Sequence, residues 1–85
     1  MRKKEVRWSE RAINDLKDIG DYIALREPGA AADFITELMS KIEIATEQYG
    51  LGRIVPELGK ENIREIIYAN YRIVYRVLEN EIHVL

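Results

Sequence analysis

NIREIIYANYRIVYRV, residues 62–77, contains two runs of strand-forming residues separated by the dipeptide Ala69-Asn70. With this dipeptide as the turn, the expected cross-strand pairs are Tyr68–Tyr71, Ile66–Ile73 and Arg64–Tyr75 on one face, and Ile67–Arg72 and Glu65–Val74 on the other. Successive side chains of a strand alternate between its faces, so Arg64 and Arg72 are expected on opposite sides of the hairpin. One side can then pack on helices, whereas the other faces water or a partner.

Two helices are predicted before this hairpin. Val6–Trp8 is expected to form a short strand, and Ser9 is a good N-cap for a helix that runs to about Arg26. Pro28-Gly29 ends that helix. Each helix has apolar residues at three- and four-residue steps, which predicts a buried stripe. The stripes are Ala12, Ile13, Leu16, Ile19 and Ile23, and then Ala31, Phe34, Ile35, Leu38, Ile42, Ala45 and Tyr49, after which Gly50 and Gly52 can end the second helix.

The helical periodicity stops after Gly52. Arg53–Leu58 is predicted as an edge strand because Pro56 lacks the N–H group that an inner strand needs. Three more strands are expected at Ile63–Tyr68, Tyr71–Leu78 and Ile82–Leu85. The predicted fold class is therefore α+β, in one domain of residues 1–85: an N-terminal strand, an antiparallel helical hairpin that covers one sheet face, and an antiparallel β-meander.

Composition excludes several classes of function. The chain has 85 residues, no cysteine and one histidine, and its carboxylates form no cluster with ligand spacing, so neither a metal nor another cofactor is expected. The basic residues at the N-terminus precede no apolar run, so neither a signal peptide nor a membrane span is predicted. A net charge of -2 disfavours a general nucleic-acid binder.

Charge is distributed unevenly along the chain. Residues 10–50 contain four basic and nine acidic residues, whereas residues 51–78 contain five basic and three acidic ones. The helical half is therefore expected to be acidic and the sheet half mildly basic, which suits an acidic or anionic partner on one side only.

The arginines of the hairpin have two interpretations. Arg72 lies diagonal to Glu65, which predicts a cross-strand ion pair of structural value, and Arg64 can stack on the ring of Tyr75. Alternatively, Arg64, Arg72 and Arg76 present donors to carboxylate or phosphate groups of a partner. For each arginine taken singly, the pattern favours the structural interpretation.

Several short elements, in this order and spacing, resemble the RelE/ParE family of toxins from type II toxin–antitoxin systems, and the ParE branch more than the ribonuclease branch. They are Trp8-Ser-Glu-Arg-Ala12, Ile19-Gly-Asp-Tyr-Ile23, Gly52-Arg-Ile-Val-Pro-Glu57, Asn62-Ile-Arg-Glu65 and Asn70-Tyr-Arg-Ile-Val-Tyr-Arg76. The resemblance covers nearly the whole chain.

The resemblance implies a cytoplasmic plasmid-stabilisation toxin that binds and inhibits DNA gyrase without catalysis or a cofactor. The hairpin pattern then makes Arg64, Arg72 and Arg76 the expected target-binding residues. It also implies a cognate antitoxin whose disordered part folds onto the toxin. One alternative is a RelE-like endoribonuclease that cuts mRNA on the ribosome, with Arg64, Arg72 and Tyr75 as its catalytic candidates. The acidic composition, and the end of the sequence at Leu85 before the basic stretch that usually follows, disfavour this alternative.

A third alternative is a non-toxic member that only binds antitoxin. For every alternative, the isolated chain is expected to expose an apolar patch between the helical hairpin and the sheet edge. A homodimer that covers this patch is an open alternative.

Overall fold

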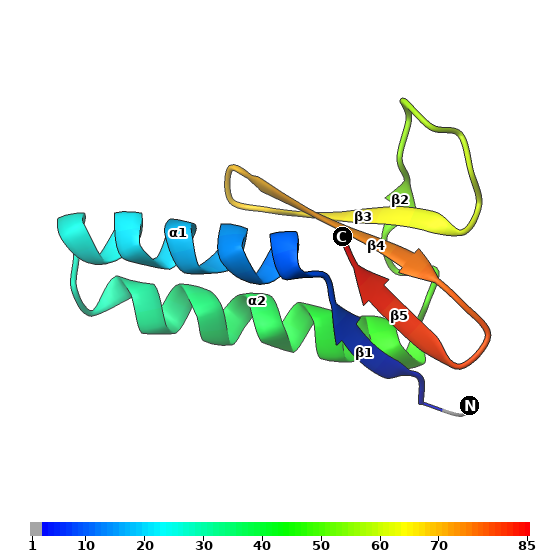
Figure 1. The fold of residues 1–85 in the computed structure, drawn as a ribbon, viewed down its shortest axis with the longest axis horizontal. Coiled ribbons are helices and arrows are strands. Elements are labelled where there is room, and N and C mark those ends of the chain that lie inside the picture. Colours follow the sequence, from blue (N-terminus) through cyan, green and yellow to red (C-terminus); the bar gives the residue numbers. More distant parts are fainter. Residues whose placement is uncertain (1–2) are drawn as a thin grey trace.

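A computed structural model describes residues 3–85 of the chain. The elements are β1 (Glu5–Trp8), α1 (Glu10–Arg26), α2 (Ala30–Glu47), β2 (Arg53–Ile54), β3 (Ile63–Tyr68), β4 (Tyr71–Val77) and β5 (Glu81–Val84). The helices run side by side in opposite directions, and their far ends project beyond the sheet (Figure 1). The predicted α+β class, with a strand, a helical hairpin and then further strands, is confirmed. Within residues 3–85, neither helix is both long and apolar enough to cross a membrane.

The five strands form one mixed sheet in the order β1-β5-β4-β3-β2. Strands β2 to β5 pair with their sequence neighbours in antiparallel fashion, as a meander does, and the register of the β3–β4 hairpin is the predicted one. The first strand pairs in parallel with the last, β5. The backbone N–H of Ser9 extends this pairing by donating to the carbonyl oxygen of Val84 at 2.9 Å.

Both helices bury one stripe against the sheet. Ser9 caps α1, its Oγ accepting a hydrogen bond from the N–H of Ala12 at 3.0 Å. The core contains two clusters of buried residues: Ala12, Leu38, Ile42, Ile73 and Val84, and then Ala45, Tyr75 and Ile82. The inclusion of Ile13 in the buried stripe was wrong, because 53% of that residue is exposed. It lies next to Ala12 but on the side of α1 that faces away from the core.

The predicted edge strand Arg53–Leu58 is much shorter in the structure. β2 ends at Ile54, and Val55 is buried while its carbonyl oxygen accepts hydrogen bonds from the N–H groups of Leu58 and Gly59. These bonds close a turn in which Gly59 has a φ of 62°, a conformation that glycine adopts without steric cost. The chain therefore leaves the sheet edge after two paired residues.

Candidate functional site

Four charged side chains form a network on the sheet face that points away from the helices. Ile73 and Tyr75 of β4 belong to the core, so Arg72, Val74 and Arg76, which alternate with them, face the other side. Arg72 Nη1 lies 3.0 Å from Oε1 of Glu65 and 2.7 Å from Oε2 of Glu57. Glu65 also accepts a hydrogen bond from Arg53 Nε at 2.5 Å. The side chain of Glu65 is fully buried.

The network links three strands and the loop after β2. Arg53 comes from β2, where it lies opposite Glu65 of β3, and Glu57 comes from the turn that follows β2. The hydrogen bond from Arg72 is the main reason why the pKa of Glu57 lies below its ordinary value, and Glu57 in turn raises the pKa of Arg72. Arg72 is therefore held between two carboxylates, so most of its charge is balanced within the fold.

The structure does not bring the three predicted target-binding arginines together. Arg64 shares the face of Tyr75, where its Nε donates to the carbonyl oxygen of Glu61 at 2.9 Å and its Nη1 to that of Gly52 at 3.3 Å. Arg76 lies on the face of Arg72 but opposite His83 of β5, outside the carboxylate network. A partner that contacts the sheet face away from the helices can therefore reach Arg72 and Arg76 but not Arg64, which lies on the opposite face.

Tyr75, the tyrosine named for the ribonuclease alternative, lies in the core. Only 1% of the residue is exposed. Its hydroxyl donates to the carbonyl oxygen of Tyr49 at 2.8 Å and accepts from the N–H of Gly52 at 2.9 Å. Burial raises its pKa, and the Gly52 hydrogen bond and the charge of Arg64 only partly oppose that shift. The hydroxyl therefore serves as a buried link between the end of α2, the start of β2 and the sheet.

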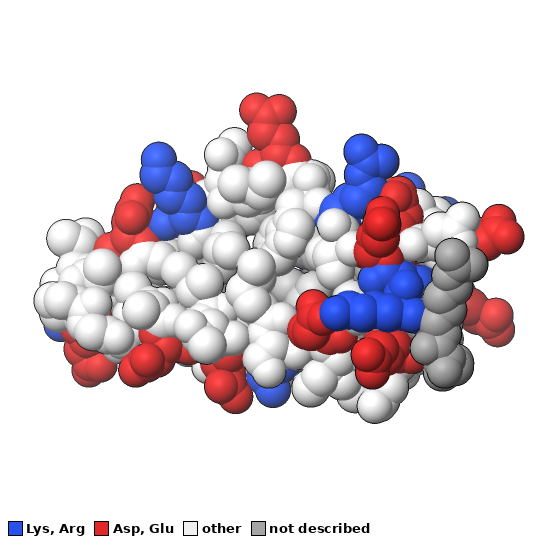
Figure 2. Space-filling view, turned by 90° about the horizontal axis from the view of Figure 1, so that it is seen from below, with Lys and Arg blue, Asp and Glu red and all other residues white. Residues whose placement is uncertain are grey.

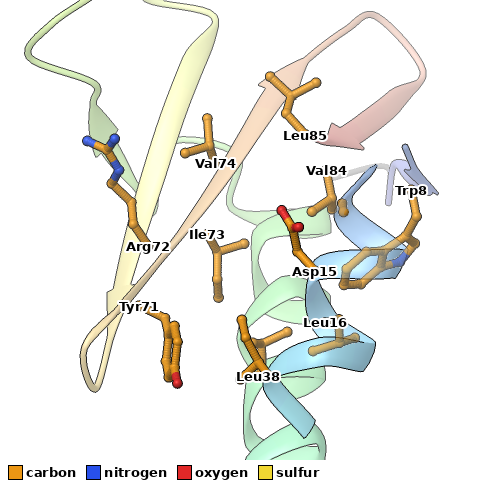
Figure 3. A pocket seen from close by; sticks show the side chains of 12 residues that line it. Trp8, Asp15, Leu16, Leu38, Tyr71, Arg72, Ile73, Val74, Val84 and Leu85 are labelled. Atoms are coloured by element: carbon orange, nitrogen blue, oxygen red, sulfur yellow. The ribbon is translucent and has the colours of Figure 1, made fainter. Parts of the chain in front are cut away.

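An apolar groove of about 130 Å³ lies between α1 and the first half of β4. Leu16 of α1, Leu38 of α2 and Tyr71 and Ile73 of β4 line its floor and sides, and the carboxylate of Asp15 lies at its mouth (Figure 3). Figure 3 also shows that Arg72 and Val74 point away from the groove, as alternation along a strand requires. The groove lies where an exposed patch between the helical hairpin and the sheet edge was predicted.

Within residues 3–85, no strand pairs with the edge of β4 beside this groove. Pairing with β5 covers Tyr75–Val77, and the last bond runs from the N–H of Leu85 to the carbonyl oxygen of Val74 at 2.9 Å. Arg72 lies two residues earlier, so its backbone N–H and C=O point to the same side as those of Val74, beyond the end of β5. An added strand would find both hydrogen-bonding groups and an apolar floor at this edge.

A second uncharged surface covers the helical hairpin. Figure 2 shows a broad area without charged side chains over the helical part of the molecule, with acidic side chains gathered along its rim. A shallow furrow between the helices is lined by Ile13, Gly20, Ala24, Ala31 and Ile35, together with other residues. The exposed Ile13 thus lines this furrow and not the groove beside β4.

Sequence reasoning missed Arg53 and Glu57 as members of the charged network. Their positions depend on where β2 pairs with β3, and two paired residues beside a proline-containing turn leave no periodic signal for that register. The sequence did offer one signal. The two-residue spacing of Ile63, Glu65 and Ile67 places Glu65 on the same face as the two isoleucines, but it cannot show that the Glu65 side chain is buried. Within residues 3–85, no group of three or more His, Cys, Asp or Glu side chains could hold a metal ion.

Comparison with known proteins gives consistent matches. Residues 6–85 match the sequence profile of a family described as the ParE toxin of the type II toxin–antitoxin system parDE. A curated relative, the candidate toxin Y4kP of Sinorhizobium fredii, is 34% identical over 79 residues, which cover 91% of this chain and 79% of the relative. A solved structure from the chromosomal ParDE system of P. aeruginosa has the same fold, with a TM-score of 0.76 and 18% identity, over 96% of this chain and 90% of that chain.

Proposed function

The chain belongs to the ParE toxin family of type II toxin–antitoxin systems, and on this premise we propose that it acts by binding and inhibiting DNA gyrase, without catalysis. The observation that carries this proposal is the separation of the groups that a ribonuclease would need. Arg64 and Arg72 lie on opposite faces of the β3–β4 hairpin, and the Tyr75 hydroxyl is buried between two backbone partners.

General acid–base catalysis requires side chains that converge on one reacting phosphate and reach its protons. Tyr75 cannot reach a bound RNA without unfolding the junction of α2 and β2, and its raised pKa disfavours an ionised form. The two carboxylates beside Arg72 would also repel a phosphate. Protein recognition has neither requirement, because a partner can contact the exposed arginine stems and the neighbouring apolar residues without proton transfer.

We propose further that a cognate antitoxin silences the protein by covering the groove between α1 and β4. The groove offers an apolar floor and an unpaired strand edge, which together suit an extended segment that adds to the sheet and inserts alternate side chains. A disordered antitoxin segment that orders on binding fits such a surface. Because gyrase and such an antitoxin are cytoplasmic proteins, we propose that the protein acts in the cytoplasm.

The first test is induced expression with two parallel readouts. We expect growth arrest, loss of negative supercoiling of a reporter plasmid, and intact mRNA, and we expect the purified protein to inhibit gyrase in vitro. Arg72→Ala should weaken inhibition several-fold, whereas Arg11→Ala on the exposed side of α1 should not. Cleaved mRNA on ribosomes with unaffected gyrase would instead identify a ribonuclease, and no arrest in the absence of antitoxin would identify a non-toxic member.

The groove is tested separately by co-expression with the protein encoded beside it. Leu16→Gln should weaken capture of that antitoxin at least tenfold, while Ile13→Gln, on the same helix outside the groove, should leave capture unchanged. We expect the free protein to form a homodimer that the same Leu16→Gln change disrupts, which sedimentation measures directly. Circular dichroism on each variant checks the fold. Equal effects of the two substitutions would rule out the groove as the docking site.

A further inference from the structure

Two arginines and a histidine form a row across the sheet face that carries Arg72. Arg7 of β1 lies opposite His83 of β5, and Arg76 of β4 lies opposite the same histidine on its other side. Residues in register on adjacent strands point to the same face, so all three point away from the helices. Adjacent strands are about 5 Å apart, so the row spans roughly 10 Å. Figure 1 shows β1, β5 and β4 as neighbours.

The row is open to solvent and has little internal neutralisation. Arg76 is exposed, the Arg7 side chain is 65% exposed, and His83 is half-buried. Glu81 contacts Arg7 only loosely, at 3.7 Å from its Nη1, and within residues 3–85 Arg76 has no ion-pair partner. The two arginines thus have only the loose contact with Glu81 to balance them among the described residues, so the row keeps an excess of positive charge. Arg72 differs in this respect, because Glu57 and Glu65 bracket it.

The residues on either side of the row define what can bind there. On one side lie Glu5 and Glu81, which face each other in register. On the other side lie Val74 and the exposed Leu85, whose side chains point away from the core beside each other (Figure 3). Across β1, β5 and β4 the surface therefore changes from acidic to basic to apolar within three successive rows.

We infer that the Arg7–His83–Arg76 row binds carboxylates of an acidic peptide segment in a partner protein. An extended peptide can place a carboxylate over the row and the apolar side chain of a residue two positions away on Val74 and Leu85, because alternate side chains of an extended segment point to the same side. Nucleic acid fits less well, since its continuous phosphates would pass the Glu5–Glu81 pair and the chain carries a net charge of -2. The inference rests on the proposed function only for the source of this segment, which is the target or the antitoxin.

The test is a titration of the ¹⁵N-labelled full chain with blocked hexaglutamate, followed by two-dimensional NMR. We expect shifts confined to the neighbourhood of Arg7, His83 and Arg76, and no shifts with blocked hexaglutamine. Arg7→Gln and Arg76→Gln should each weaken binding about threefold to tenfold and the double variant more than tenfold, as for the loss of charge-assisted hydrogen bonds. Arg11→Gln, whose side chain is 89% exposed on α1, is the charge-matched control and should bind like the parent chain.

Three results would overturn the inference: no shifts at millimolar hexaglutamate, equal weakening by Arg11→Gln, or tighter binding of a thymidine hexanucleotide to the same residues. The titration contains no gyrase and no antitoxin, so its failure leaves the proposed function standing. Conversely, if the chain binds the peptide but does not inhibit gyrase, the proposed function is contradicted and the inference about the Arg7–His83–Arg76 row still stands. Circular dichroism and thermal unfolding of each variant separate lost binding from lost folding.

Discussion

Arg72 contacts a carboxylate that the fold has removed from water: its Nη1 lies 3.0 Å from Oε1 of Glu65, whose side chain is fully buried. A buried carboxylate is costly unless donors satisfy it, and here the donors are two arginines that remain partly exposed. The pair therefore has a structural role whatever its part in target binding. A loss of activity in an Arg72 variant must be separated from a loss of stability.

The first prediction concerns this network. Arg53→Ala and Arg72→Ala should each lower the unfolding free energy only modestly, because each leaves Glu65 one remaining arginine and the arginines themselves are partly screened by solvent. The double variant should cost roughly 1 to 3 kcal/mol more than the sum, since the buried carboxylate then has no partner. Urea unfolding of the four proteins measures this coupling. Additivity within about 0.5 kcal/mol would show that water replaces the arginines.

A second prediction concerns the hydroxyl of Tyr75. Tyr75→Phe should destabilise the fold by about 1 to 3 kcal/mol, because the buried N–H of Gly52 loses its acceptor and the carbonyl of Tyr49 loses the hydroxyl donor. Tyr22→Phe, at a half-exposed position on α1, is the matched control and should change stability by less than about 0.5 kcal/mol. Equal stabilities of the two variants in chemical denaturation would contradict this role for Tyr75.

The same residue predicts a dependence on alkaline pH. Burial raises the folded-state pKa of Tyr75 above the ordinary value of 10.0, so between these two pKa values the folded chain binds more protons than the unfolded chain. Stability should therefore be complete below pH 10 and fall as the pH rises through the folded-state pKa. The difference between the parent chain and Tyr75→Phe should shrink from pH 9 to pH 11. A constant difference would show that Tyr75 ionises equally in both states.

Gly52 provides the sharpest steric prediction. A Cβ at this position would lie 2.6 Å from the carbonyl oxygen of Glu65 and 2.8 Å from the Tyr75 hydroxyl. Gly52→Ala must therefore shift the backbone of β3 or break the buried hydrogen bond between the Gly52 N–H and the Tyr75 hydroxyl. We expect a loss of about 2 kcal/mol or more, in the range for overpacked sites. Gly50→Ala, where a Cβ would meet nothing within 4 Å, should be neutral or slightly stabilising. Thermal unfolding of both variants compares them, and similar melting temperatures would refute the steric argument.

The backbone conformation of Ala69 in the β3–β4 turn predicts that Ala69→Gly stabilises the fold. Ala69 has a φ of 53°, a left-handed conformation that costs a residue with a Cβ roughly 1 to 2 kcal/mol. Ala69→Gly removes that cost but adds freedom to the unfolded chain, so we expect a net gain of about 0.5 kcal/mol. Asn70→Gly is the control, because Asn70 is not among the described residues with positive φ, and it should gain nothing. A destabilised Ala69→Gly variant in the same urea assay would disprove the strain.

The sequence predicted those features that depend on neighbours along the chain. Ser9 was recognised as the N-cap because capping is chemistry within one turn, and the β3–β4 register followed from the position of a two-residue turn. The division of Arg64 and Arg72 between two faces followed from that register. Ile13 shows the limit of periodicity, because a three-or-four-residue step does not define which edge of a broad stripe remains exposed.

Within the candidate site, the sequence identified the arginines but not their surroundings. Local alternation and turn chemistry determined which elements form, how β3 pairs with β4, and which family the chain resembles. Only the tertiary structure decided that β1 pairs in parallel with β5, that Glu65 is buried between Arg53 and Arg72, and that Arg7, His83 and Arg76 form one row. Those contacts join residues up to 76 positions apart in sequence, as Arg7 and His83 show. Packing and sheet closure bring them together, and no short-range pattern encodes such distances.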